Sequence, residues 1–480
     1  MVIVVRIPAL FQSVAGADEG LYALVAREWA GGHLPYTTVW ETKPPLFFAI
    51  LASAMLLFGK SMLAMRIAGD VAIACTACAL YSIGRSVHRG GHAIGLTAGL
   101  LYAALTVSDS GSSAVAEIFY APFVALPLAV ILRGQVPPRA PGRGLRLIAL
   151  GALLGCAVLV KESALLEVAY VACVLAWACE AAYVPALLLG VTLPIAASMI
   201  PYLVTRNFPL YWDANISALA RRAFVAVPDV APWTDVVRAQ ALAFFPATLL
   251  VLGISWAWNR DETDADDRML IVAMIGWALV ALATVALMRE YLGNQFIGAM
   301  APACVLSALV TVRLAARLRR PALVPAIVLL ALVAHSAYQF VLAAPVAYGR
   351  LSTGDPDFGD PTAQLGAYLA SREAAARGLY VADDRTVLYV LTGASPPTRY
   401  AYPPHLLDRY QEIVAGVDGP REIAHVLDQH PAYVVRDLAN RRHEDPRGKA
   451  LLDRALQAEY RRIYSLGTRT VYQLTGPGSS

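Results

Sequence analysis

The sequence predicts a polytopic α-helical membrane protein with a small α/β domain at its C-terminal end, and three observations support this prediction. Of the 480 residues, 58% are hydrophobic and only 15% are charged, whereas soluble globular proteins carry about a quarter charged residues. Apolar runs of about 18 residues or more, each long enough to cross a bilayer as a helix, recur between residues 61 and 345. After residue 351 charged residues mix with short strand-like runs. The net charge of +4 is small and scattered, which argues against a nucleic-acid partner.

The first residues, MVIVVRIPALFQSV, are apolar but too short to span a bilayer, and Arg6 interrupts them. They have the composition of the end of a transmembrane helix whose beginning is absent, as an upstream start codon or a truncation would produce. We therefore expect the first helix of the membrane domain to be incomplete in this sequence.

Ten membrane spans are predicted after this segment. They lie at 61–85, 92–108, 117–133, 145–160, 163–180, 182–204, 239–258, 269–287, 295–313 and 322–345. The connections after the first, third and ninth spans are basic, and basic loops stay on the cytoplasmic side. The resulting alternation places on the extracytoplasmic face residues 1–60, the loop around Asp109, the loops 205–238 and 289–294, and everything after residue 346.

The C-terminal part reads as a separate small domain. A turn-rich linker, STGDPDFGDP, precedes three strand-like runs, GLYVAD, PAYVVRD and TVYQLTG. Two amphipathic stretches, HLLDRYQEIVAG and PREIAHVLDQH, lie between the first two runs. We expect a transmembrane domain over residues 1–350 and an extracytoplasmic α/β domain over residues 351–480.

The exported loop over residues 15–60 carries the most informative residues. Its apolar side chains at 21, 24, 25 and 29 share one helical face, which predicts an amphipathic helix over 19–30 lying flat at the membrane interface. Asp18 and Glu19 stand at the N-terminus of this helix. They are either a helix cap that interacts with the dipole or a pair of reactive carboxylates.

Lys43 follows in the motif WETKPPL, with Glu41 two residues before it. A residue that precedes proline is pushed into extended conformation, and proline readily begins a helix. Lys43 is therefore expected at the mouth of a helix, at the level of the lipid headgroups. It is either a snorkelling anchor or a ligand for a phosphate that arrives from the membrane.

Together these pieces resemble a known superfamily. The acidic pair followed by YA, then GHLPY, then W-x-x-KPPL and LLFGKSMLAMRIAG is similar to the first exported loop of the GT-C glycosyltransferases. It looks most like the family that contains the protein O-mannosyltransferases and the aminoarabinose-to-lipid A transferases. The resemblance is dense over residues 16–70 and continues more weakly through 116–123, 151–165 and 288–303.

The resemblance implies a GT-C-like fold and an activity. Enzymes of this kind sit in the cytoplasmic membrane with their active site on the outer face, and take a sugar from a polyprenyl-phosphate donor. The expected function is therefore inverting transfer of the sugar to an acceptor hydroxyl on a lipid, a glycan or a protein. The resemblance leaves a divalent metal ion open and implies no other cofactor.

The resemblance also implies roles for individual residues. Asp18 matches the catalytic base, Glu19 completes the acidic pair, and Glu117 matches a second catalytic acid, although it also suits an ordinary interface glutamate. Lys43 and Arg289 are expected to bind the donor phosphate. Further candidates for substrate binding are Tyr22, Tyr36, Glu41, Lys161 and Tyr291. Arg66 matches a family arginine that organises helices.

Two other functions stay open at this point. A transporter or flippase of lipid-linked sugars would place charges in the middle of the membrane and show repeated halves. Here the charges cluster at one interface and no repeat is evident, which favours the enzyme. A non-catalytic assembly or sensor protein would leave the presence of both Asp18 and Lys43 in one exported loop as a coincidence.

Overall fold

The structure is a computed structural model of the chain. It describes residues 6–7, 12–13, 16, 18–107, 112–134, 141–177, 181–225, 265–289, 292–439 and 445–475. The predicted span 239–258 and most of the apolar N-terminal segment lie outside these ranges.

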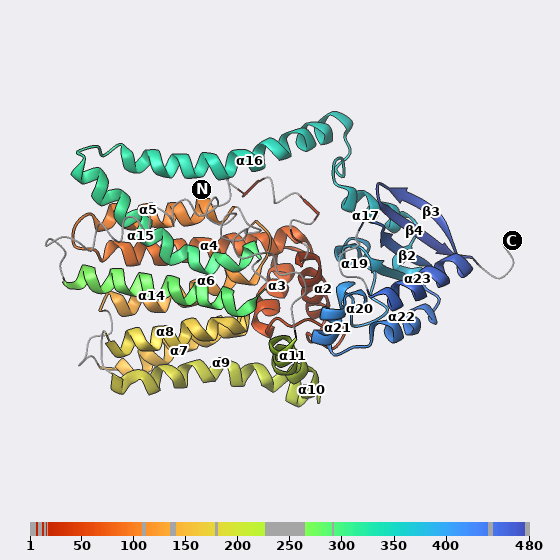
Figure 1. Ribbon diagram of the computed structural model, residues 1–480, viewed down its shortest axis with the longest axis horizontal. Coiled ribbons are helices and arrows are strands. Elements are labelled where there is room, and N and C mark those ends of the chain that lie inside the picture. Colours follow the sequence, from red (N-terminus) through yellow and green to blue (C-terminus); the bar gives the residue numbers. More distant parts are fainter. Residues whose placement is uncertain are drawn as a thin grey trace.

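Long apolar helices form a bundle at one end of the molecule (Figure 1). They are α4 (Met62–Arg85), α5 (Gly91–Leu105), α6 (Ala116–Leu132), α7 (Arg143–Val160), α8 (Leu165–Leu175), α9 (Val184–Val204), α14 (Ala265–Met288), α15 (Ile297–Arg317) and α16 (Leu323–Thr353). These helices occupy the other nine predicted span ranges. Among the described residues, five helical segments are long and apolar enough to cross a membrane, which confirms the prediction of a multi-pass membrane protein.

Close helix contacts in the bundle depend on glycine. Gly151 and Gly155 of α7 lie against α9, and Gly190 of α9 lies against α7, where a Cβ atom on any of them would collide with backbone of the facing helix. Small residues let two helices approach closely. In a bilayer the hydrophobic effect does not drive helices together, so this close van der Waals packing holds them in contact.

Short helices gather at the end of the bundle that faces the C-terminal domain (Figure 1). They are α2 (Glu19–Ala30), α3 (Pro45–Phe58), α10 (Phe208–Trp212), the π-helical turn η4 (Asp213–Ser217) and α11 (Ala218–Phe224). The expected helix mouth is present: Pro44 is extended (φ −63°, ψ 157°) and α3 begins at Pro45. The first eight residues of α2 are all buried, so this helix does not lie flat on lipid as expected. The difference arises because α2 packs against both α3 and the C-terminal domain.

The C-terminal domain contains a four-stranded sheet in the order β1-β2-β4-β3. β1 (Leu379–Asp383) and β2 (Tyr433–Asp437) are parallel, while β4 (Arg469–Leu474) pairs antiparallel with β2 and with β3 (Tyr460–Leu466). Helices α17 (Pro361–Ser371), α18 (Ala374–Arg377), α19 (Val387–Thr392), α20 (Pro404–Leu407), α21 (Arg409–Ala415), α22 (Gly419–Leu427) and α23 (Pro446–Glu459) complete it. A helical membrane domain with a small α/β domain is the predicted fold class, which is confirmed.

Candidate active site

Asp18 is the N-terminal flanking residue of α2, yet its carboxylate makes no capping hydrogen bond. Instead it faces two tyrosines: Tyr402 Oη donates to Oδ1 at 3.2 Å, and Tyr22 Oη lies 3.5 Å from Oδ2. Among the described residues Asp18 has no ion-pair partner within salt-bridge distance. Burial raises the pKa of Asp18 above its ordinary value, although Lys43 opposes this shift. A carboxylate with a raised pKa and no direct cationic contact is suited to accept a proton.

Glu19, the neighbouring acid, has a different environment. It is fully buried, and Arg66 of α4 binds both of its oxygens, Nε to Oε1 at 2.9 Å and Nη2 to Oε2 at 2.6 Å. The backbone N–H of Ala114 also donates to Oε1 at 3.0 Å. Such a bidentate pair fixes geometry strongly. Glu19 therefore ties α2 to the bundle directly beside Asp18.

Lys43 is fixed by a hydrogen bond to its backbone carbonyl, which does not engage its ammonium group. The buried Tyr36 donates from Oη to the Lys43 carbonyl at 2.7 Å, and its own backbone is left-handed (φ 71°). Burial alone would lower the pKa of Lys43, but Glu41 and Glu162, with a smaller contribution from Glu117, outweigh it and raise the pKa. The ammonium group therefore stays charged, as a phosphate ligand requires.

Glu117 and Lys161 form a buried pair at the same end of the bundle. Glu117 lies in the first turn of α6, and its Oε1 accepts from Lys161 Nζ at 2.6 Å and from Asn294 Nδ2 at 3.1 Å. These three residues come from separate elements. Their two hydrogen bonds to Glu117 therefore connect α6 with the end of α7 and with the turn before α15. The predicted residues Glu117 and Lys161 are thus brought together near Asp18 and Lys43.

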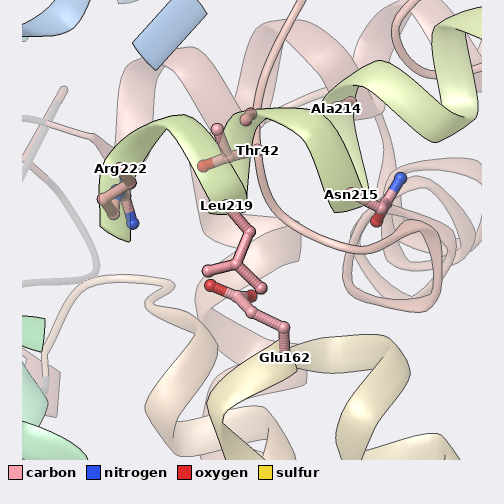
Figure 2. A pocket seen from close by; sticks show the side chains of 7 residues that line it. Thr42, Glu162, Ala214, Asn215, Leu219 and Arg222 are labelled. Atoms are coloured by element: carbon pink, nitrogen blue, oxygen red, sulfur yellow. The ribbon is translucent and has the colours of Figure 1, made fainter. Parts of the chain in front are cut away.

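A small pocket is lined by Thr42, which precedes Lys43 in the sequence, and by residues of distant elements (Figure 2). It encloses about 210 Å³ including its mouth and is lined by Thr42, Glu162, Ala214, Asn215, Ala218, Leu219 and Arg222. Glu162 points toward the helix that carries Leu219 and Arg222, and its Oε2 is buried without a hydrogen-bond partner among the described residues. Arg222 acts electrostatically on Lys43, so two cations lie near one another at this edge of the site.

The remaining predicted residues lie in different places. The ring of Tyr22, whose hydroxyl faces Asp18, packs edge-on against Phe47 with the ring centroids 5.0 Å apart. Glu41 is buried and accepts a hydrogen bond from Thr42 at 3.0 Å. Arg289, the second expected phosphate ligand, is exposed just after α14. Asn294, further along the chain, donates to Glu117. Tyr291 lies outside the described residues.

Sequence reasoning missed Tyr402 and Arg222. Tyr402 belongs to the domain in which the sequence showed no motif, and nothing local distinguishes it from other tyrosines. Arg222 lies in the predicted exported loop 205–238, where the paired arginines of LARRAF were the available signal. Within the described ranges no group of three or more His, Cys, Asp or Glu residues could hold a metal ion, so we derive no step through a metal.

The chain is similar to known proteins in sequence over part of its length and in fold over nearly all of it. Residues 42–211 match the family described as dolichyl-phosphate-mannose-protein mannosyltransferase. The fold is similar to that of ArnT from Cupriavidus metallidurans bound to undecaprenyl phosphate, with a TM-score of 0.67 and 15% identity over 99% of this chain and 97% of ArnT. It is also similar to the archaeal oligosaccharyltransferase AglB from Archaeoglobus fulgidus in complex with an inhibitory peptide and a dolichol-phosphate, with a TM-score of 0.52 and 12% identity over 100% of this chain and 74% of AglB. No curated protein sequence matches the chain. The fold that the resemblance implies is thereby confirmed, and the family match covers residues 42–211.

Proposed function

We propose that this chain, a membrane protein of the GT-C type, transfers a sugar from a polyprenyl-phosphate donor to an acceptor hydroxyl, with inversion and with Asp18 as general base. The observation that carries this proposal is the pairing of two groups at the mouth of α3. Asp18 is a carboxylate held by tyrosine hydroxyls rather than by a cation, and the charged Lys43 lies close enough to act on its pKa.

The proposed reaction is a single displacement. The acceptor oxygen attacks the anomeric carbon and forms the new glycosidic bond while Asp18 takes the hydroxyl proton. The bond between the anomeric carbon and the phosphate oxygen breaks, and its electron pair leaves with the polyprenyl phosphate. Since attack and departure occur on opposite faces of one carbon, its configuration inverts. The raised pKa of Asp18 makes it a stronger base than an ordinary aspartate.

Lys43 and Arg222 are proposed to bind the donor phosphate. Negative charge grows on the phosphate as the glycosidic bond breaks, and a preorganised pair of cations in a partly buried site stabilises that charge. Arg222 takes this role in place of Arg289, because Arg222 acts on Lys43 whereas Arg289 is exposed just after α14. We propose positioning roles for Glu19 and for the pair of Glu117 with Lys161, whose polar atoms are engaged within the protein.

The donor sugar is proposed to lie at the mouth of the pocket that Thr42 and Glu162 line. The buried Oε2 of Glu162 accepts no hydrogen bond from the described residues, and a sugar hydroxyl could donate one to it. The lipid tail would follow α3, whose last residues Leu56, Leu57 and Phe58 are 67%, 76% and 60% exposed. A polyprenyl-phosphate carrier agrees with the undecaprenyl phosphate and dolichol-phosphate of the two similar structures.

The site is proposed to face the extracytoplasmic side of the cell membrane. The basic connections lie at the other ends of the helices that bring Glu117 and Lys161 to the site, and basic loops stay in the cytoplasm. The lipid-linked donor suits this face, because the carrier delivers the sugar through the membrane.

Replacement of Asp18 tests the proposal. The purified protein in lipid vesicles would be given polyprenyl-phosphate sugars, and release of the free carrier phosphate would be measured with an envelope extract as acceptor. Asp18→Asn should lower turnover by about 10²–10⁴-fold, which is the usual contribution of a general base. Asp428→Asn is a matched control, because it removes the same charge at an exposed position of the C-terminal domain. Undiminished turnover in Asp18→Asn would show that the assignment is wrong.

A further inference from the structure

The C-terminal domain is docked directly on the helix that carries Asp18. The Arg27 guanidinium donates to the carbonyls of Tyr389 at 2.5 Å and Ala394 at 2.6 Å, both in or next to α19. At the other end of α2, Gly20 lies so close to Val387 that a Cβ atom would come within 2.7 Å of the Val387 nitrogen. Real Cβ atoms do not make such contacts, so glycine permits this approach. α2 is therefore clamped at both ends by α19.

A second contact joins the domain to the chain just before Lys43. The backbone N–H of Trp40 donates to the Arg399 carbonyl at 2.7 Å. The Trp40 ring is fully buried and meets His405 edge-on, with centroids 4.8 Å apart. Burial lowers the pKa of His405 to about 3, so this neighbour of the site is neutral. The segment from Arg399 to His405 is thus fixed against the exported loop.

Tyr402 lies in the middle of this segment and reaches Asp18. Its hydroxyl donates to Asp18 Oδ1 at 3.2 Å, across 384 residues of sequence. Its ring packs edge-on against His405, with centroids 5.1 Å apart. Burial and the charge of Asp18 raise the pKa of Tyr402 well above its ordinary value, so the hydroxyl keeps its proton and remains a donor.

We propose that Tyr402 is a positioning residue which holds the Asp18 carboxylate in place, so that the C-terminal domain completes the active site. This inference rests on the proposed role of Asp18 as base. The second tyrosine, Tyr22, lies at 3.5 Å from the other carboxylate oxygen, a distance at which a hydrogen bond is weak. Tyr402 is therefore the better of the two donors.

The hydrogen bond has an electrostatic consequence. Burial, Glu41 and Glu117 raise the pKa of Asp18, while Lys43 and the hydroxyl of Tyr402 lower it; Tyr22, the remaining group that faces Asp18, is neutral because burial raises its pKa. A donor to an ionised carboxylate stabilises the charged form. Loss of the Tyr402 hydroxyl should therefore raise the pKa of Asp18 further and leave less of the base ionised on the acid side.

The test compares Tyr402→Phe with Tyr400→Phe in the full-length protein in lipid vesicles, with kcat/KM for the polyprenyl-phosphate sugar measured across pH. Tyr400 is a matched control because its hydroxyl accepts from Arg399 at 2.7 Å and does not touch Asp18. Tyr402→Phe should move the acid limb of the profile to higher pH and lower kcat/KM at neutral pH by roughly three- to tenfold, the size expected for one hydrogen bond. Tyr400→Phe should leave the profile in place.

A second substitution keeps the inference testable if Tyr402→Phe folds poorly. Incorporation of 3-fluorotyrosine at position 402 keeps the ring and makes its hydroxyl a stronger donor, so the acid limb should move to lower pH. An acid limb that stays in place in both variants, while Asp18→Asn abolishes turnover, would overturn the role of Tyr402 and leave the proposed function intact. Full turnover in Asp18→Asn would overturn both.

Discussion

Removing the charge of Glu19 distinguishes a structural acid from a catalytic one. Glu19 and Arg66 are 0% and 2% exposed, so water cannot solvate the guanidinium that Glu19→Gln would leave without its anion. Loss of one partner from a buried ion pair typically destabilises a protein by about 3–5 kcal/mol. The amide oxygen of glutamine can still accept from Ala114, so the expected loss lies near the lower end of that range.

The assay is thermal unfolding of the detergent-solubilised protein together with turnover of the fraction that remains folded. Glu19→Gln should unfold at a clearly lower temperature, and its folded fraction should keep most of the turnover. The double variant Glu19→Gln/Arg66→Met should regain much of the stability, because replacing a buried pair on both sides is often neutral. A wild-type unfolding temperature combined with a loss of turnover of 100-fold or more would refute this reasoning and restore Glu19 as a catalytic residue.

Two further predictions concern the donor. Lys43→Met should weaken donor binding and lower kcat, because the ammonium group would no longer contact the phosphate or the charge that grows on it. The initial rate as a function of donor concentration measures both effects. An unchanged kcat would exclude Lys43 from leaving-group stabilisation. Glu162→Gln should raise KM for the donor by roughly threefold to tenfold with a smaller change in kcat, because it weakens one hydrogen bond to the sugar. Thr42→Val, which lines the same pocket without removing a charge, is its control, and an equal effect of both variants would argue against a specific contact from Glu162.

The helices of the membrane domain could be predicted from the sequence because the bilayer imposes a strong local rule. A segment in hydrocarbon must satisfy its backbone hydrogen bonds internally and carry apolar side chains, so each span is visible as an apolar run of defined length. Strands β1, β2 and β4 of the small domain were visible for a related reason, since strands with mostly buried side chains are apolar. β3 was missed because most of its side chains are not buried, and its exposed Arg461 and Arg462 hide the pattern.

The sequence by itself also determined the local setting of Lys43. A lysine before two prolines and an apolar run is expected just before a helix begins, and α3 does begin at Pro45, two residues after Lys43. The resemblance over residues 16–70 then directed attention to the acidic pair. It implied that Asp18 is the base, but it gave Glu19 no role of its own beyond completing the pair.

Only the tertiary structure shows how the surroundings of the two carboxylates differ, and the proposed roles rest on that difference. Glu19 meets Arg66, 47 residues away, and Asp18 meets Tyr402, 384 residues away. Whether a carboxylate is an anchor or a base depends on which cations, hydroxyls and apolar atoms surround it, because these set its pKa and its freedom to accept a proton. Those neighbours come from distant parts of the chain and from a second domain, so no pattern around residue 18 can contain them.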